Sequence, residues 1–239
     1  VIFQMRKSNI RLKKKGSNIE VLYEDNHIIA INKKSGDLVQ GDKSRDTPLP
    51  EIVKLFLKNK YSKPGNVFLG VIHRLDRPTS GVVLFAKTSK ALKRFNKIFK
   101  EGKIEKTYYA ITKNKPPKQS DTLVHWLKKN EKINKSTHFI NKHKESKKAI
   151  LHYKILKKLV NYYLLEIKIE TGRHHQIRCQ LSAIGCPIKG DMKYGSKRSN
   201  KDGGIDLHAK KIIFEHPISK KNIEINAPVK NNSVWKTIK

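Results

Sequence analysis

One carboxylate, Asp76, lies between two arginines, Arg74 and Arg77, in the segment HRLDRPTSG. Positive charge beside a carboxylate favours its ionised form, so Asp76 could act as a nucleophile or a base but not as an acid. The alternative is structural, because the carboxylate could cap the Pro-Thr-Ser-Gly turn by accepting the amide hydrogen of Thr79 or Ser80. The local sequence taken alone favours this structural role.

A tyrosine and an arginine elsewhere in the chain could complete such a site. In the strand predicted at 103–112, the two-residue period places Lys106 and Tyr108 on one face and Tyr109 on the other. Before other information is considered, a tyrosine such as Tyr108 is more often a packing residue than a catalytic phenol. In the predicted helix that carries HQIR, Arg178 lies one residue off the apolar stripe, so its guanidinium could reach a half-buried site.

The same segment contains residue types that bind metals, namely His174, His175 and Cys179. His175 and Cys179 are four residues apart, but a third ligand at helical spacing is missing, so we predict no metal site. Packed or RNA-facing histidines are the expected alternative.

Amphipathic runs predict three helices. Segments 48–60 and 89–101 have apolar residues at helical spacing, and a third helix follows Thr171 and ends near Gly185. Ser89 and Thr171 are the predicted N-caps of the second and third helices.

Short β-branched and aromatic runs predict the strands. They lie at 19–33, where an Asp-Asn turn indicates a hairpin, and at 67–74, 81–88, 103–112, 149–156, 162–170, 207–216 and 222–228. The Lys-rich segment 128–148 is predicted to be either a long mobile loop or a twisted hairpin. Because hairpins dominate and helices are few, the predicted fold class is α+β, with a mixed and mainly antiparallel sheet flanked by helices and loops.

The charge of the chain indicates a polyanionic partner. Its 239 residues include 53 Lys and Arg against 20 Asp and Glu, a formal net charge of +33, and 37% are hydrophobic, enough for an ordinary core. We find neither an apolar stretch of membrane-spanning length nor a basic amphipathic helix with a strong apolar face, so nucleic acid is favoured over a membrane surface. A composition biased toward Lys, Ile and Asn is the alternative source of part of this charge.

The ends and the cysteines of the chain allow further expectations. Residues 1–18 are basic and poor in apolar residues, so we expect a loosely attached arm before one folded domain at 19–239, with residues 1–4 a cloning remnant. Two cysteines without CxxC spacing predict neither a disulfide framework nor structural zinc, and a cytoplasmic location is expected. We find no Gly-rich phosphate loop, so no nucleotide cofactor is expected, and we expect a monomer.

Three segments, in this order, resemble the active-site motifs of the RluA-type family of RNA pseudouridine synthases. They are HRLDRPTSG at 73–81, KTYYA at 106–110 and TGRHHQIR at 171–178, and the similarity extends over about residues 19–228. The resemblance implies the pseudouridine synthase fold and the isomerisation of specific uridines in structured rRNA or tRNA. In this reaction the base detaches from C1′, rotates and rejoins through C5, and the resemblance implies no cofactor and no metal.

Carried over residue by residue, the resemblance implies roles for the charged and aromatic residues. Asp76 matches the catalytic aspartate, Tyr108 the tyrosine that stacks on the target base, and Arg178 the arginine that pairs with the aspartate. Arg74 resembles the residue that fills the gap left by a flipped-out base. The further expected RNA contacts are Arg77, Lys106, Arg173 and His175.

The resemblance has two departures and leaves two rival functions open. Lys34 stands where the family often has proline, which is expected to change a loop but not catalysis. Residues 1–18 are too few for the S4-like domain of many members, so target selection is expected to fall to the catalytic domain. The rivals are a non-catalytic RNA-binding protein with this fold and a nucleosidase. Hydrolytic glycosidases typically use two carboxylates, and the motif supplies one.

Overall fold

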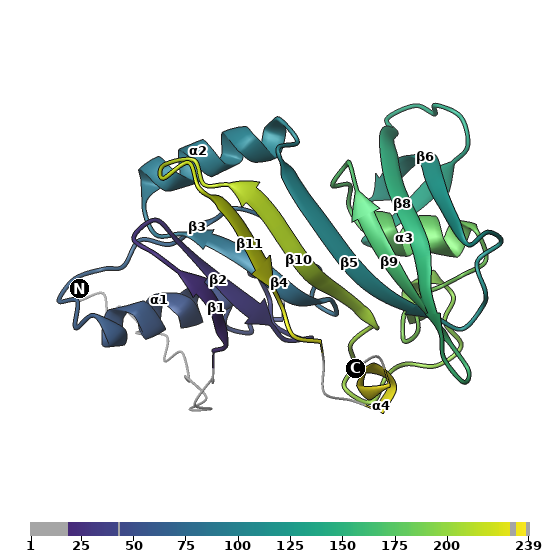
Figure 1. Ribbon diagram of the computed structural model, residues 1–239, viewed down its shortest axis with the longest axis horizontal. Coiled ribbons are helices and arrows are strands. Elements are labelled where there is room, and N and C mark those ends of the chain that lie inside the picture. The colour runs from purple at the N-terminus through teal and green to yellow at the C-terminus, as the bar shows by residue number, and fades with distance from the viewer. Residues whose placement is uncertain (1–18, 43, 230–232, 238–239) are drawn as a thin grey trace, which may run out of the picture.

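A strongly twisted sheet connects the two halves of the molecule (Figure 1). The computed structural model describes residues 19–42, 44–229 and 233–237, so the arm predicted at 1–18 lies outside the described residues. The strands are β1 (Val21–Glu24), β2 (Ile28–Lys33), β3 (Gly70–Val71), β4 (Ser80–Ala86), β5 (Ile104–Thr112), β6 (Ser120–Asn130), β7 (Lys135–Phe139), β8 (Lys147–Lys158), β9 (Tyr163–Ile169), β10 (Leu207–Glu215) and β11 (Asn222–Asn226). In the described part they lie in the order β1-β2-β4-β10-β5-β9-β8-β6-β7, with β11 beside β10 and β3 beside β4.

The strand directions confirm the predicted α+β class with a mixed, mainly antiparallel sheet. β4 and β10 are parallel neighbours, and the other strand pairs described are antiparallel. The hairpin predicted at 19–33 is formed by β1 and β2. This topology brings β4, β10 and β5, which come from distant parts of the chain, side by side at the middle of the sheet.

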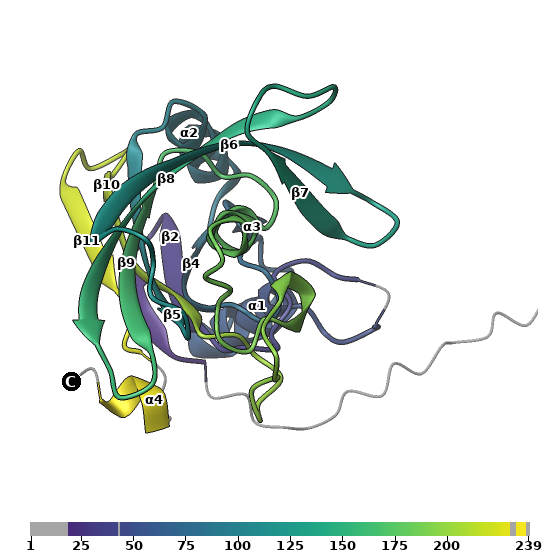
Figure 2. The ribbon, with the colours of Figure 1, turned by 90° about the vertical axis from the view of Figure 1, so that its right-hand side faces the viewer.

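The three longer helices lie on one side of the sheet. The helices are α1 (Leu49–Lys60), α2 (Ser89–Lys100), α3 (Gln176–Ala183) and the short α4 (Ser233–Lys236), with a 3-10 turn at Met192–Tyr194. Figure 2 shows α1, α2 and α3 on the same side of the sheet, and β6 and β7 curl over α3. The loop before β4 and the loop before α3 both contribute residues to one cavity.

Strand β4 is the centre of the N-terminal half, and all seven of its residues are buried. Its sequence, SGVVLFA, is a continuous apolar run of the kind expected for a strand that is covered on both faces. Gly81 has a φ of +113°, and a Cβ added there would lie 2.3 Å from the backbone oxygen of Ala209 on β10. Glycine is therefore required where the chain leaves the HRLDRPTS loop and enters the sheet.

Two local predictions in this half are wrong. The run at 67–74 forms only the two-residue strand β3, because the chain leaves the sheet at Ile72 to build the loop before β4. Helix α2 is capped by Thr88 and not by Ser89. Thr88 has the extended backbone of an N-cap, and its Oγ1 accepts the amide hydrogen of Ala91 at 3.1 Å.

The first part of the Lys-rich segment 128–148 forms the hairpin that was one of the two predicted alternatives, and residues 140–146 form the loop that leads to β8. β6 and β7 pair in register from Trp126 with Phe139 to Asn130 with Lys135. The inner face of the hairpin is apolar enough to pack, since Leu127 joins a buried cluster with Ala149, Cys179 and Tyr194. This cluster fixes the hairpin against α3.

Candidate active site

The loop between β3 and β4 presents Asp76, and its main chain closes the turn. The amide of Thr79 donates to the backbone carbonyl oxygen of Asp76 at 3.0 Å. The turn is thus closed by a carbonyl group, in contrast to the side-chain cap considered from the sequence. The carboxylate of Asp76 is left to make contacts outside its own loop.

A buried lysine supports this loop from below. Lys33, at the end of β2, is 1% exposed, and its Nζ donates to the backbone oxygens of Arg77 at 3.0 Å and Thr79 at 2.6 Å. The hydroxyl of Ser35 donates to the carbonyl oxygen of Pro78 at 3.1 Å. These contacts fix the main chain that follows Asp76, so the position of the carboxylate is fixed as well.

Arg178 pairs with Asp76 across the cleft, as expected, but it also has a second partner that the sequence motifs do not single out. Its Nη1 donates to Asp76 Oδ2 at 3.1 Å, while Nε and Nη2 donate to the two carboxylate oxygens of Asp191 at 2.6 and 2.9 Å. Burial alone would lower the pKa of the Arg178 guanidinium, but Asp191 and Asp76 raise it above its ordinary value. Arg178 is therefore a fixed cation that orients Asp76.

Tyr108 lies on β5 and forms another wall of the same cavity. It pairs with Ala209 on β10 and with Ile167 on β9, and its side chain is 8% exposed. Burial, and then the negative charge of Asp76, raise the pKa of the Tyr108 phenol above its ordinary value. The phenol is consequently protonated over the physiological pH range and presents a neutral aromatic ring to the cavity.

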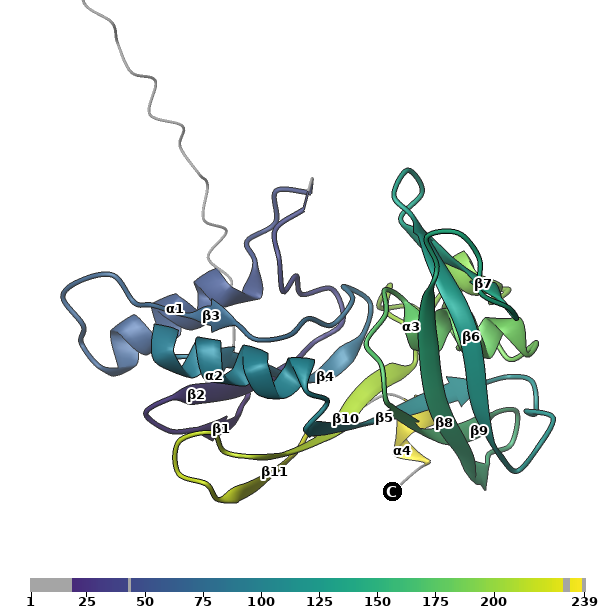
Figure 3. The ribbon, with the colours of Figure 1, turned by 90° about the horizontal axis from the view of Figure 1, so that it is seen from above.

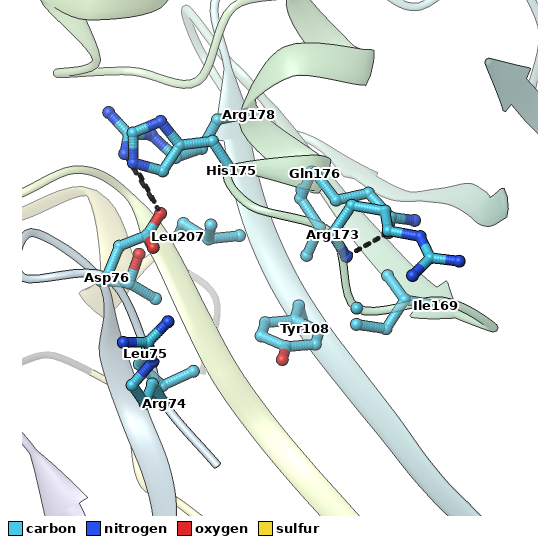
Figure 4. A pocket seen from close by; sticks show the side chains of 13 residues that line it. Arg74, Leu75, Asp76, Tyr108, Ile169, Arg173, His175, Gln176, Arg178 and Leu207 are labelled. Carbon is cyan, nitrogen blue, oxygen red and sulfur yellow. Dashed lines mark hydrogen bonds and ion pairs between the residues drawn. The ribbon is translucent and has the colours of Figure 1, made fainter. Parts of the chain in front are cut away.

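These residues surround an open cavity of about 120 Å³ (Figure 4). Asp76 and Arg178 lie on one side, and the ring of Tyr108 lies across from them. Leu75, Ile169 and Leu207 supply apolar surface. The lining thus combines aromatic and apolar surface, which suits a flat, uncharged base, with one carboxylate and three arginines, Arg74, Arg173 and Arg178.

The expected RNA contacts divide into two groups. Arg74, Arg173 and His175 line the cavity, whereas Arg77 and Lys106 do not belong to its lining. Arg77 forms ion pairs with Asp46 and, at 3.6 Å, with Asp42 of the preceding loop.

The remaining polar residues near this cavity have different degrees of exposure. Lys106 is half-buried, lies 5.7 Å from the centre of the Phe99 ring, and has a pKa lowered by burial. His175 is 8% exposed and lies at the base of the cavity, whereas the side chain of Arg74 is exposed and donates to Gln40 Oε1. Of the expected contact residues that line the cavity, Arg74 and Arg173 are exposed and His175 is buried.

The segment before α3 is a loop, which corrects the N-cap prediction for this helix. The helix begins at Gln176 after His175, whose φ of 52° is left-handed. Thr171 does not cap it, because its Oγ1 accepts the amide hydrogen of Ile150 at 2.9 Å and donates to Gln176 Oε1 at 2.8 Å. Arg173 Nε donates to the carbonyl oxygen of Lys148 at 2.9 Å. The loop is therefore attached to β8 and turns the following helix so that Arg178 faces Asp76.

Two side chains contribute to this site without having been predicted. Asp191 is 1% exposed and Tyr194 is 4% exposed, and the centre of the Tyr194 ring lies 5.1 Å from Arg178 Cζ. Both lie in the segment GDMKYG, which belongs to the resemblance. Their partner, however, is 13 to 16 residues away in sequence, and no periodic pattern links the two segments. The presence of Asp191 and Tyr194 in a segment that resembles the family was the signal in the sequence that could have identified them.

The described residues contain no group of three or more His, Cys, Asp or Glu side chains arranged to bind a metal ion. Cys179 is buried, and its Sγ donates to the carbonyl oxygen of Ser136 at 3.3 Å. Within the described ranges, no helix combines the length and apolarity that crossing a membrane requires.

Comparison with known proteins places these features in a family. The model of the RNA pseudouridylate synthase family matches residues 27–183. The chain is 36% identical to ribosomal large subunit pseudouridine synthase C of Rickettsia bellii (strain RML369-C), over 92% of this chain and 71% of that relative. It is 35% identical to the protein of the same name from Buchnera aphidicola subsp. Baizongia pistaciae (strain Bp), over 97% of this chain and 73% of the relative.

Solved structures show the same fold. The human RNA pseudouridylate synthase domain containing 4 structure aligns with a TM-score of 0.75 at 20% identity and covers 92% of both chains. The human domain containing 1 structure aligns with a TM-score of 0.65 at 20% identity, over 92% of this chain and 93% of that one. Because the family model spans more than half of the sequence and the relatives align over nearly all of it, this chain belongs to the RNA pseudouridylate synthase family and is an RNA pseudouridine synthase.

Proposed function

We propose that the enzyme isomerises specific uridines of large-subunit ribosomal RNA and that Asp76 is the catalytic residue. The observation that carries the proposal is the position of Asp76, which is bound by Arg178 at one oxygen and faces Tyr108 across a cavity of the right chemistry for uracil. Ribosomal RNA is favoured over transfer RNA because relatives named for the large ribosomal subunit match this chain over 92% and 97% of its length. Such a substrate agrees with the expected cytoplasmic location.

The position of the carboxylate favours a flipped-out uridine. The side chain of Asp76 is 30% exposed and lines the cavity, and the side chain of Arg74, which lines the same cavity, is exposed. A base stacked in an RNA helix could not bring its C1′ to this carboxylate, so the nucleotide would leave the stack. Arg74 is then well placed to occupy the gap in the helix.

The residues of the cavity can support either route of glycosidic bond cleavage. The carboxylate of Asp76 could attack C1′ or help to remove the hydrogen at C2′, and in both routes it gains from being held close to the sugar. The neutral phenol of Tyr108 could stack on the detached uracil while the base rotates, and could move a proton when C5 replaces N1. Arg178 stabilises the charge of Asp76 whenever it returns to the carboxylate form.

The cavity argues against the nucleosidase alternative. Asp76 is the one carboxylate among the described residues that line it, whereas hydrolytic glycosidases typically use a pair. An aromatic wall such as Tyr108 that holds the detached base beside the sugar would favour its return through C5 over its loss to solvent.

Tritium release tests this proposal. A large-subunit ribosomal RNA transcript labelled with [5-³H]uridine should release tritium with the wild-type enzyme, and total transfer RNA serves as the comparison substrate. Asp76→Asn should reduce release by about 10³-fold or more, because the group that reacts is removed. The same variant should bind the transcript as tightly as wild type, because phosphate contacts dominate affinity.

The other outcomes identify the rivals. Free uracil in the products would indicate a nucleosidase. Full activity of Asp76→Asn, or a Kd that rises together with loss of the folded circular dichroism spectrum, would make Asp76 a structural residue. Tritium release from transfer RNA but not from the ribosomal transcript would show that transfer RNA is the substrate.

A further inference from the structure

His175 has an unusual backbone and is buried beside the catalytic carboxylate. Its φ and ψ are 52° and 26°, a left-handed conformation that is uncommon for residues other than glycine, although asparagine, aspartate and histidine adopt it more often than other side chains do. This conformation turns the imidazole inward, where Nε2 lies 3.6 Å from Asp76 Oδ2 and Nδ1 lies 3.0 Å from the hydroxyl of Tyr194. The residue was expected to contact RNA, yet both ring nitrogens face protein groups.

The contacts of Tyr194 assign the tautomer of His175. The Tyr194 hydroxyl oxygen accepts the amide hydrogen of Ser136 at 2.8 Å, and its own hydrogen has two acceptors within reach. His175 Nδ1 is the closer, at 3.0 Å, and the carbonyl oxygen of Ser136 is at 3.4 Å. The shorter distance favours donation from the Tyr194 hydroxyl to Nδ1, which leaves the ring proton of a neutral His175 on Nε2.

Electrostatics favours the same tautomer. With the proton on Nε2, an N–H group points toward the carboxylate of Asp76. In the other tautomer a nitrogen lone pair would face that negative charge. Burial, and next the charge of Arg178, lower the pKa of His175 to about 2, so the ring is neutral at physiological pH. His175 thus offers Asp76 a hydrogen-bond donor without neutralising it.

We propose that His175 is a positioning residue whose Nε2–H, oriented by Tyr194, holds Asp76 Oδ2 together with Arg178 when RNA is bound. The inference rests on the proposed catalytic role of Asp76. Arg178 Nη1 lies 3.1 Å from the same oxygen, so both nitrogen donors approach Oδ2. The 3.6 Å separation is longer than a hydrogen bond, and such contacts commonly shorten in the substrate complex.

A pair of substitutions separates this role from a structural one. His175→Gln keeps an N–H group near the position of Nε2, and His175→Asn keeps only a group near the position of Nδ1. Asparagine tolerates the left-handed conformation better than glutamine, so His175→Asn should be the more stable variant. If His175 acts as a donor to Asp76, His175→Gln should nevertheless be the more active variant.

We expect His175→Asn to lower single-turnover kcat by about 10- to 100-fold, the value of a hydrogen bond to a charged group. His175→Gln should stay within about threefold of wild type, and both should bind the labelled ribosomal transcript with unchanged Kd because no phosphate contact is lost. Tyr194→Phe, which removes the hydroxyl that sets the tautomer, should lower kcat by about 3- to 10-fold with unchanged Kd. Thermal unfolding of each variant reports the structural effect separately.

The inference requires His175→Gln to be more active than His175→Asn. Equal activity of the two His175 variants, or greater activity of His175→Asn, would overturn it, since stability would then explain the residue. The proposed function fails in a different way. If wild type releases no tritium, or if Asp76→Asn remains active, the role of Asp76 is wrong whatever the His175 variants do.

Discussion

At the residue scale, Arg178 depends on a carboxylate that lies outside the three motifs. Asp191 is 1% exposed and takes two of the three guanidinium contacts, whereas Asp76 takes one. A buried guanidinium needs such a partner, because an unpaired charge in the interior is strongly unfavourable. Asp191 thus allows Arg178 to keep one N–H group available for Asp76.

Removal of Asp191 should therefore affect both stability and activity. We expect Asp191→Ala to lower the free energy of unfolding by about 3 kcal/mol, because it leaves the charge of Arg178 buried with a single partner. Urea unfolding measures this loss, and tritium release should fall in parallel. Glu131→Ala is the control, since Glu131 pairs with Lys129 through a side chain that is 78% exposed. An equally small effect of both changes would contradict this account of Asp191.

At the element scale, α2 contacts His73 and so supports the loop that carries Asp76. The imidazole of His73 stacks on Phe99 of α2 with ring centres 5.2 Å apart, and its Nε2 accepts the amide hydrogen of Leu84 on β4 at 3.1 Å. Burial, and then the charge of Lys106, lower the pKa of His73 to about 3, so the ring is neutral and can accept. Helix, strand and loop are joined three residues before Asp76.

The N-cap of α2 offers a test at this scale. Thr88→Ala should lower the free energy of unfolding by about 1 kcal/mol, because the amide of Ala91 loses its acceptor. Ser89→Ala should have little effect, since Ser89 is the first residue of the helix and not its cap. Chemical denaturation of both variants makes the comparison. A larger loss for Ser89→Ala would show that the cap lies one residue later.

At the scale of the whole molecule, the positive charge has a defined place beside the cleft. Segment 128–148 contains eight lysines and two glutamates. Figure 3 shows this hairpin and the loop that precedes α1 projecting on the same side of the molecule. The end of this segment also contacts a residue of the cavity, because Arg173, which lines the cavity, donates to the carbonyl oxygen of Lys148 at the start of β8. RNA phosphates on either side of a bound uridine would meet this charge.

Neutralising two lysines of segment 128–148, one in the turn between β6 and β7 and one in the loop before β8, should therefore weaken RNA binding but not chemistry. For Lys132→Ala combined with Lys144→Ala, we expect the slope of log Kd against log salt to fall by about 1 to 2, since each phosphate contact contributes about 0.9. kcat at saturating RNA should be unchanged.

The matched control changes Lys220 and Lys221, which are exposed in the turn between β10 and β11, away from the hairpin. Filter binding at several salt concentrations measures both pairs. Equal slopes for the two double variants would mean that RNA binding does not depend on where the positive charge lies on the surface.

The sequence by itself determined the fold class, most of the strands, the three helices and the grouping of Asp76, Tyr108 and Arg178. Hydrophobic periodicity fixes which segments form strands and helices, and the motif segments carry the chemistry. Only the tertiary structure decided the partners. Arg178 and Asp76 are 102 residues apart, and His175 meets Tyr194 and Asp76 from different loops. Such contacts depend on how the sheet twists and where each loop leaves it, and local periodicity contains no record of either.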